Sequence, residues 1–354
     1  MSRLHCDQTC ITALVTALVA EFKSHSALLG WYLSDETPTD LIPMITERQN
    51  LVASLDPHHI TYFVEEYYTS AGATAFRQGI AAGTSAIFGV DDYPWDGPAG
   101  AFGNSSLNVS VSIGHEGALQ QTMSQVFQGE GNFGLCSAMQ TFNMKALFCG
   151  KCQRDNETKW CYRCNATFPP LDVERAMAFI QPVASRSVGV IQFSYSSAFD
   201  HYNDTSQTYG PLSRSDPIMQ QRLQELHTIG LEFSNFIGNE FLWEWTGLTT
   251  NCSKLGTNPT VFAASFGNPR RGLQTIMVVN SVSTSQPVTV YLKNGTSLHV
   301  LLEPWQVLIK QADTASSRNT SFGPLETAAA TSAVLPCPLQ PRHSTPWTVH
   351  AFHW

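Results

Sequence analysis

The sequence predicts an α/β fold built on a parallel sheet, followed by a small antiparallel β-domain. Three observations carry this prediction. Short apolar runs end repeatedly in polar or aromatic residues, segments with helical periodicity separate these runs, and the chain turns to β-rich runs after residue 247. Strands that alternate with helices form βαβ units, and such units give a parallel sheet.

The first apolar run, Ala27–Leu33, is followed by the adjacent carboxylates Asp35 and Glu36. A continuous apolar run is typical of a parallel strand that is covered on both faces. Four similar runs predict further strands near residues 60–65, 85–91, 134–141 and 188–195. The tips of these strands carry Glu65, Glu66 and Tyr67, then Asp91, Asp92, Tyr93 and Trp95, then Gln140, and finally Tyr195.

Helical segments precede and separate these strands. Helical spacing of apolar residues or helix-compatible composition predicts helices over 12–22, 40–54, 71–82, 116–128, 172–184 and 216–243. Five strand–helix units follow, whereas a TIM barrel, (β/α)₈, has eight. We therefore expect residues 1–247 to form a partial (β/α)₈ barrel that lacks its first strands, with an open edge on the strand at Leu28. A complete open α/β sheet is the alternative.

The C-terminal third predicts a different architecture. Five β-rich runs separated by turn residues lie between residues 260 and 310, which predicts a compact antiparallel β-sandwich over 248–311. From residue 312 the chain is rich in Ser, Thr, Ala and Pro without periodicity. We expect a disordered tail over 312–354.

Composition limits the partners. The chain is 43% hydrophobic and 14% charged, so a sizeable core is available, and the few charges suit an uncharged polar ligand such as a sugar. A net charge of −8 and a pI near 5.7 argue against nucleic acid. The apolar stretch Ile11–Ala20 is too short to span a membrane. The sequence gives no oligomeric state.

Asparagine usage indicates the compartment. Eight of the sixteen asparagines begin Asn-x-Ser/Thr sequons, and this enrichment predicts a secreted or lumenal glycoprotein. The sequons begin at Asn104, Asn108, Asn156, Asn165, Asn203, Asn251, Asn294 and Asn319. We expect the signal peptide to lie upstream of the present start.

Nine cysteines add a second feature. Cys149, Cys152, Cys161 and Cys164 are spaced as two Cys-x₂-Cys pairs, which predicts two disulfides in an oxidising lumen, with a zinc site as the alternative. Neither arrangement is catalytic, because four thiolates close a metal site. Cys136 is the unpaired cysteine that we expect to be buried on a strand. The sequence predicts no cofactor and no catalytic metal.

The strand Gly30–Glu36, the strand tip Asp91–Trp95 and the closing segment Leu302–Trp305 resemble TIM-barrel glycoside hydrolases with an appended β-sandwich. The likeness covers residues 12–311 and is one of architecture, without a diagnostic signature. In many such enzymes the fourth strand carries the acid/base carboxylate, which the resemblance places on Glu36. The Asp35–Glu36 pair is also similar to the pair of β-hexosaminidases, in which the Asp orients the acetamido group and the Glu is the acid.

Other barrel glycosidases place their carboxylates on the fourth and sixth strands, which implies Glu36 or Asp35 together with Asp91 or Asp92. Glycosidic cleavage needs one protonated carboxylic acid and one ionised carboxylate. We therefore expect the catalytic residues among Glu36, Asp35, Asp91 and Asp92. Expected substrate-binding residues are Trp31, Glu65, Glu66, Tyr67, Tyr93, Trp95, Gln140 and Tyr195.

One departure from the glycosidase pattern keeps other functions open. The tip Met139–Asn143 has no carboxylate, although the commonest retaining barrels carry a nucleophilic Glu on the seventh strand. An inactive carbohydrate-binding barrel would explain its absence. A metal-dependent barrel hydrolase or lyase is a second alternative, which Asp91 and Asp92 with Glu65 and Glu66 would serve. Asp35 and Glu36 are also typical of a helix N-terminus.

Overall fold

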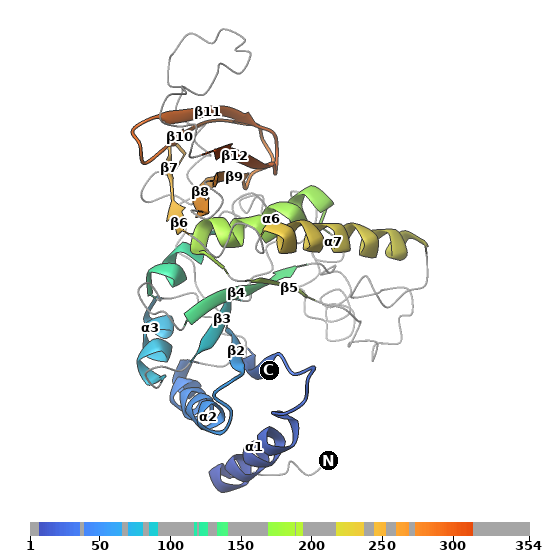
Figure 1. Ribbon diagram of the computed structural model, residues 1–354, viewed down its shortest axis with the longest axis vertical. Helices are drawn as coiled ribbons and strands as arrows, with labels where there is room; N and C mark the ends of the chain where they lie inside the picture. Colours follow the sequence, from blue (N-terminus) through green and yellow to red (C-terminus); the bar gives the residue numbers. More distant parts are fainter. Residues whose placement is uncertain are drawn as a thin grey trace, which may run out of the picture.

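The structure is a computed structural model of the 354-residue chain. It describes residues 7–35, 39–65, 70–80, 85–90, 117–118, 120–126, 133–140, 169–187, 189–193, 217–236, 244–252, 260–268 and 273–313. In these ranges it shows two sheet systems with a helical layer between them (Figure 1).

The first sheet is parallel and follows the order of the chain. Its strands are β1 (Gly30–Asp35), β2 (Ile60–Glu65), β3 (Ala86–Val90), β4 (Phe133–Gln140) and β5 (Gly189–Phe193). They pair in the order β1-β2-β3-β4-β5, every pair parallel. A doubly wound sheet reverses its strand order at a switch point, whereas a (β/α)₈ barrel adds each strand beside the last. The sheet therefore has the order of five consecutive barrel strands, as predicted.

Helices alternate with these strands: α1 (Gln8–Phe22), the 3₁₀ turn η1 (Thr39–Leu41), α2 (Ile42–Leu55), α3 (Ser70–Gly79), α6 (Leu171–Ser185) and α7 (Pro217–Phe236). Helix α2 packs against β1 and β2 and also against α1 and α3. Between this helical layer and the sheet lies a core in which the Phe76 ring meets Phe63 edge-on at 4.5 Å and Phe88 at 5.5 Å. Among the described strands, β1 and β5 form the two edges, so the open edge predicted at β1 is confirmed.

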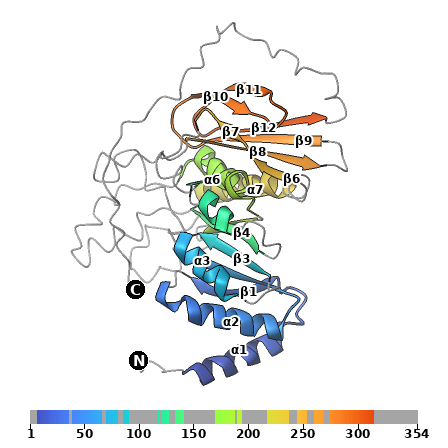
Figure 2. The ribbon, with the colours of Figure 1, turned by 90° about the vertical axis from the view of Figure 1, so that its left-hand side faces the viewer.

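The second sheet system is antiparallel, also as predicted (Figure 2). A four-stranded sheet has the order β12-β9-β8-β6 and a three-stranded sheet the order β11-β10-β7. Their strands are β6 (Glu244–Gly247), β7 (Thr249–Thr250), β8 (Val261–Asn268), β9 (Leu273–Asn280), β10 (Gln286–Tyr291), β11 (Ser297–Leu302) and β12 (Val307–Asp313). A core that includes Ile276, Val278, Val288 and Val290 joins the strands of this domain. Strand β6 begins four residues before residue 248, where the sequence placed the start of this domain.

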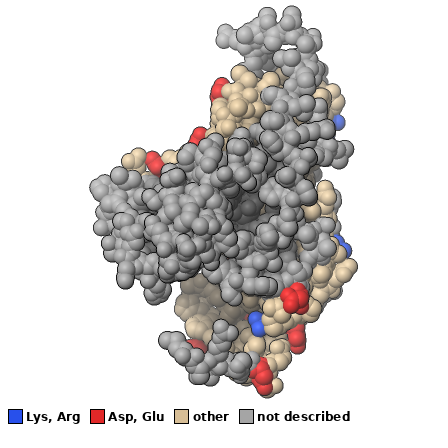
Figure 3. Space-filling view, turned by 180° about the vertical axis from the view of Figure 1, so that it is seen from behind, with Lys and Arg blue, Asp and Glu red and all other residues tan. Residues whose placement is uncertain are grey.

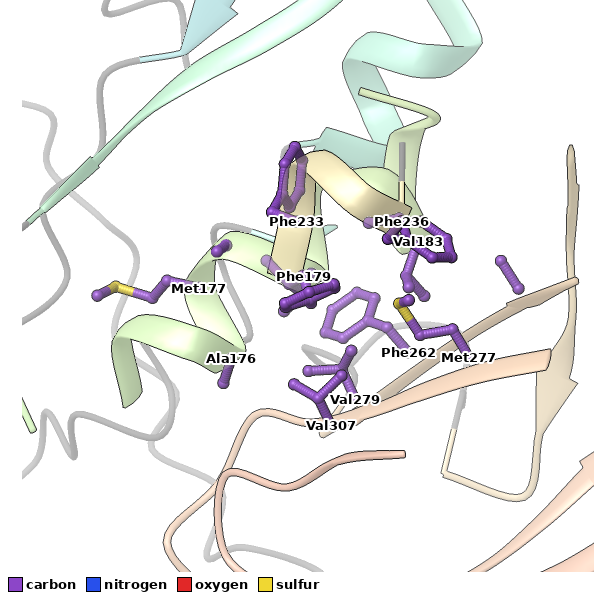
Figure 4. Close-up of a cluster of buried hydrophobic side chains, with 14 of the residues drawn as sticks. Ala176, Met177, Phe179, Val183, Phe233, Phe236, Phe262, Met277, Val279 and Val307 are labelled. Carbon is purple, nitrogen blue, oxygen red and sulfur yellow. The ribbon is translucent and has the colours of Figure 1, made fainter. Parts of the chain in front are cut away.

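Helix α6 belongs to both systems. It contacts β4 and β5 on one side and β8, β9 and β12 on the other. Figure 4 shows Phe179 of α6 with Phe233 and Phe236 of α7, close to Phe262 and Met277 of the antiparallel sheet. The Trp245 indole N–H of β6 donates to the Pro182 carbonyl oxygen at 3.0 Å. The β-domain is thus seated on a barrel helix through a continuous apolar core.

The ion pair of Arg175 and Glu232 supports this junction. Arg175 donates to Glu232 through Nε at 2.8 Å and through Nη2 at 2.5 Å, which ties α6 to α7. Its Nη1 donates to the Val307 carbonyl oxygen of β12 at 3.3 Å. A planar guanidinium that makes three such contacts fixes geometry better than a lysine would.

The structure describes some of the cysteines and leaves others outside the described residues. Cys136 is free and buried on β4, as predicted. Cys10 and Cys252 are disulfide-bonded. The four-cysteine cluster at Cys149–Cys164 and the tail from residue 314 lie outside the described residues. None of the described helices is long and apolar enough to cross a bilayer.

Candidate active site at the carboxyl ends of the parallel strands

The carboxyl ends of the five parallel strands meet at one edge of the sheet. In register, Asp35 of β1 is opposite Val64, Glu65 of β2 is opposite Val90, and Gln140 of β4 is opposite Phe193. Three predicted site residues therefore occupy the last positions of their strands. In (β/α)₈ barrels this is the edge at which the chemistry takes place.

The remaining predicted residues follow these ends in the chain. Glu36 comes directly after Asp35, Glu66 after Glu65, and Asp91 after Val90. Eight predicted residues lie outside the described residues: Glu36, Glu66, Tyr67, Asp91, Asp92, Tyr93, Trp95 and Tyr195. The distance between Glu36 and Asp91 or Asp92 therefore stays a prediction. Asp35 itself is exposed at the end of β1.

Strand β1 is irregular just before its carboxylate. Its register against β2 shifts between Tyr32 and Ser34, so that Tyr32 pairs with Tyr62 and Ser34 with Phe63. Ser34 is buried, whereas the next residue, Asp35, is exposed. A bulge re-aims the side chains that follow it and is common beside active sites. This register shift was not predictable from the sequence, because it depends on the partner strand.

Trp31 lies away from this edge. Its indole N–H donates to Asp56 Oδ2 at 3.0 Å, and Asp56 precedes β2, at the amino ends of the strands. The structure therefore does not bring Trp31 to the predicted cleft. His59 Nδ1 also lies 2.8 Å from Asp56 Oδ2. Trp31 and His59 therefore lie at the amino ends of the strands, the face of a barrel at which residues contribute to stability.

A pair of tyrosines covers the face of the sheet opposite the Phe63 core. Tyr32 and Tyr62 stack with their ring centroids 5.4 Å apart. The Tyr62 hydroxyl donates to the Cys136 carbonyl oxygen of β4 at 3.0 Å, so this side chain reaches over β3. Neither tyrosine is among the site residues predicted from the sequence. Their alternation with Leu33 and Phe63, which pack on the helical side, is the signal that would have placed them on the other face.

Among the described side chains of the central strands, Cys136 has a clearly shifted pKa. Burial raises the pKa of its thiol to about 12, so the thiol stays protonated at neutral pH. A protonated, buried thiol is a poor nucleophile and a poor metal ligand.

In the described part of the chain no three His, Cys, Asp or Glu side chains are grouped as metal ligands. On the face seen in Figure 3, charged side chains of the described residues are scattered and form no basic patch.

The chain was compared with protein-family models, curated proteins and solved structures. No protein-family model and no curated protein matches the sequence. Among solved structures, the chain is similar to a glycoside hydrolase family 5 protein from Bacteroides vulgatus, with 13% identity and a TM-score of 0.48 over 86% of this chain and 64% of the other. It is also similar to a debranching enzyme from Nostoc punctiforme, with 11% identity and a TM-score of 0.42 over 86% and 61%.

A maltogenic α-amylase from Thermotoga neapolitana is similar at 10% identity and a TM-score of 0.40, over 86% of this chain and 64% of the other. The chain thus spans less than two thirds of these three solved chains. At these identities and TM-scores the likeness assigns no activity to this chain, and its barrel order is established by the strand pairing itself.

Proposed function

We propose that this chain is part of a (β/α)₈-barrel glycoside hydrolase that cleaves O-glycosidic bonds with carboxylates at the ends of β1 and β3. The sequential strand order carries this proposal. It places Asp35, which immediately precedes Glu36, at the same sheet edge as Val90, which immediately precedes Asp91. A second acidic strand end, Glu65, lies between them in the sheet.

Under this proposal the carboxylates have separate roles. Glu36 protonates the leaving oxygen, and Asp91 or Asp92 acts as the nucleophile or base. Asp35 orients a substrate group. The substrate contacts come from Glu65, Glu66 and Gln140, and from the aromatic residues Tyr67, Tyr93, Trp95 and Tyr195, whose ring faces stack on sugar rings.

Activity in this proposal requires a closed sheet. The described sheet has edges at β1 and β5, and a barrel closes only when strands join its two edges. Until then water reaches the site from the open side. We therefore expect little or no turnover from the chain alone. We expect turnover once further strand–helix units pair with β1 and β5.

Glu36→Gln tests the acid assignment in a form of the protein whose barrel is closed. A glutamine keeps the shape of the side chain but donates no acidic proton, so kcat on an aryl glycoside panel should fall about 10²-fold or more. The limb of the pH profile that reports the acid should also disappear. Glu21→Gln is the matched control, because Glu21 is an exposed carboxylate on α1. Equal activities of Glu36→Gln and Glu21→Gln would remove Glu36 from the mechanism.

A second candidate function is sugar binding without hydrolysis. The observation that favours it is that β4 ends in Gln140, an amide where a carboxylate would be expected. Titration calorimetry with an oligosaccharide that binds, followed by product analysis, separates the two candidates. Binding without any released sugar over long incubation supports the binding protein, and released sugar supports the hydrolase.

A further inference from the structure

The hairpin between β10 and β11 presents an asparagine to solvent. In its turn the Leu292 amide donates to the Thr296 carbonyl oxygen at 2.9 Å, and Gly295 has a φ of 81°. That backbone conformation favours glycine, which fixes the shape of the turn. Asn294, Gly295 and Thr296 are all exposed. They form the sequon Asn-Gly-Thr.

Thr296 orients the Asn294 side chain within this turn. Asn294 Oδ1 accepts hydrogen bonds from the Thr296 amide at 3.0 Å and from the Thr296 hydroxyl at 2.6 Å. Because both donors hold the oxygen, Nδ2 is the atom left toward solvent. Within the described part of the chain, this nitrogen donates no hydrogen bond.

The sequon at Asn251 is arranged in the opposite way. Asn251 Oδ1 accepts from the Thr289 amide of β10 at 2.8 Å, and Nδ2 lies 3.5 Å from the Pro287 carbonyl oxygen. The middle residue of this sequon, Cys252, is buried. The side-chain amide thus continues the pairing of β7 with β10, with its nitrogen against the backbone of the sheet.

We propose that Asn294 is an N-glycosylation site of this protein and that Asn251 is not. The co-substrate is a lipid-diphosphate-linked oligosaccharide, with a lumenal transferase as the catalyst. Asn294 Nδ2 forms a bond to the anomeric carbon of the first sugar, and the bond from that carbon to the diphosphate oxygen breaks. The lipid diphosphate leaves with the electron pair, Nδ2 loses one proton, and nothing is oxidised or reduced.

The local structure of the two turns distinguishes the two asparagines. A glycan on Asn294 extends from the hairpin tip into solvent and leaves both contacts of Oδ1 intact. A glycan on Asn251 would crowd the Pro287 backbone, which lies 3.5 Å from Nδ2, and would strain the side-chain link between Asn251 and β10. The fold therefore favours the first modification and disfavours the second.

Site-specific occupancy tests the proposal. The full chain is secreted from cultured animal cells behind a cleavable signal peptide, and the folded secreted protein is treated with peptide-N-glycosidase in heavy-oxygen water. Mass spectrometry should find the label at Asn294 and none at Asn251. An unlabelled Asn294, or a labelled Asn251, overturns the proposal. Cleavage of the signal peptide, read from the new N-terminus, proves entry into the lumen independently of either site.

Three variants separate the glycan from the turn. Thr296→Val removes the hydroxyl at similar volume and should abolish the label at Asn294, whereas Thr296→Ser should retain it. Asn294→Asp keeps the oxygen that Thr296 holds but has no amide nitrogen, so it should lose the glycan with an unchanged unfolding midpoint. Retention of the label in Thr296→Val would show that modification at this position does not use the sequon.

Discussion

Asp56 is the buried carboxylate that joins two segments at the amino ends of β1 and β2. It is only 3% exposed. Burial raises its pKa, but hydrogen bonds from the Trp31 indole, the His59 ring and the His58 amide outweigh burial and hold the pKa below its ordinary value. The ionised form is therefore the one that the fold stabilises.

Asp56→Asn should destabilise the protein by about 1–3 kcal/mol at pH 7, the range for hydrogen bonds to a buried charged group. Because the pKa is lower in the folded state, this stability is present above the unfolded value of about 3.9 and is lost as the pH falls through the folded value. Urea unfolding of the variant and the parent at pH 7, 5 and 3.5 should show their difference narrowing at the lowest pH.

The control for this experiment is Asp40→Asn, which neutralises an exposed carboxylate and should change stability little at any pH. A difference between Asp56→Asn and the parent that stays constant from pH 7 to 3.5 would contradict the ionised role of Asp56.

At the scale of single residues, prediction from sequence was least successful where a partner far away in the chain determines the position of a side chain. Proximity to Asp35 in the sequence predicts Trp31 in the cleft. Its hydrogen-bond partner, Asp56, comes from the turn after α2. Trp31 lies near the amino end of the six-residue strand β1 and Asp35 at its carboxyl end, so the two residues are at opposite ends of the strand. The free, buried Cys136 was predictable, because it lies in an apolar run and is an odd cysteine among nine.

At the scale of the elements, the close approach of β2, β3 and β4 depends on Gly89. A Cβ at this position would lie 2.5 Å from the Cys136 carbonyl oxygen and 2.6 Å from the Tyr62 hydroxyl. The first of these is backbone and cannot move without opening the sheet. The bridge from Tyr62 to Cys136 therefore requires glycine beneath it.

Gly89→Ala should cost about 3 kcal/mol, the upper end of the range for overpacking. Denaturant unfolding measures the loss. Gly247→Ala on β6 is the matched control, because a Cβ there would meet only the Trp245 ring, at 3.3 Å or more. Adding Tyr62→Phe to Gly89→Ala should recover little, because the backbone clash remains. If Gly89→Ala and Gly247→Ala lowered the free energy of unfolding equally, the parallel sheet would have relaxed around the new methyl group.

Strands were predictable at this scale because their apolar runs are continuous or alternate. The order of the five parallel strands also followed from the chain. The helix predicted over 216–243 is confirmed over the described residues of α7, Pro217–Phe236; residues 237–243 lie outside the described residues, and β6 begins at Glu244.

For the whole molecule, the main finding is that the parallel sheet and the β-domain share α6. Phe179 meets Phe233 at 5.6 Å and Phe236 at 6.1 Å between ring centroids, and it is fully buried. The sequence predicts both units and a border between them near residue 248. The shared core was not predictable, because its members come from segments far apart in the chain.

Phe179→Ala should destabilise the protein by about 3–5 kcal/mol. Since α6 contributes to both units, they should unfold in one transition, seen at the same denaturant concentration by far-UV circular dichroism and by tryptophan fluorescence. Phe63→Ala, in the core under α2 and α3, is a control of equal size. Two separated transitions in the parent protein would show that the β-domain folds independently of α6.

The place of α6 between two sheets also orders events during synthesis. A ribosome delivers α6 well before β8, β9 and β12, and domains commonly fold from the N-terminus as they emerge. The strands β1 to β5 can dock one by one, because each pairs only with a neighbour already present or next to emerge. The outer side of α6, which carries Phe179 and Val183, becomes buried only after residues up to Val307 have been synthesised. The nascent chain therefore exposes an apolar helix face during the synthesis of the β-domain, and this is the interval in which it most needs a chaperone.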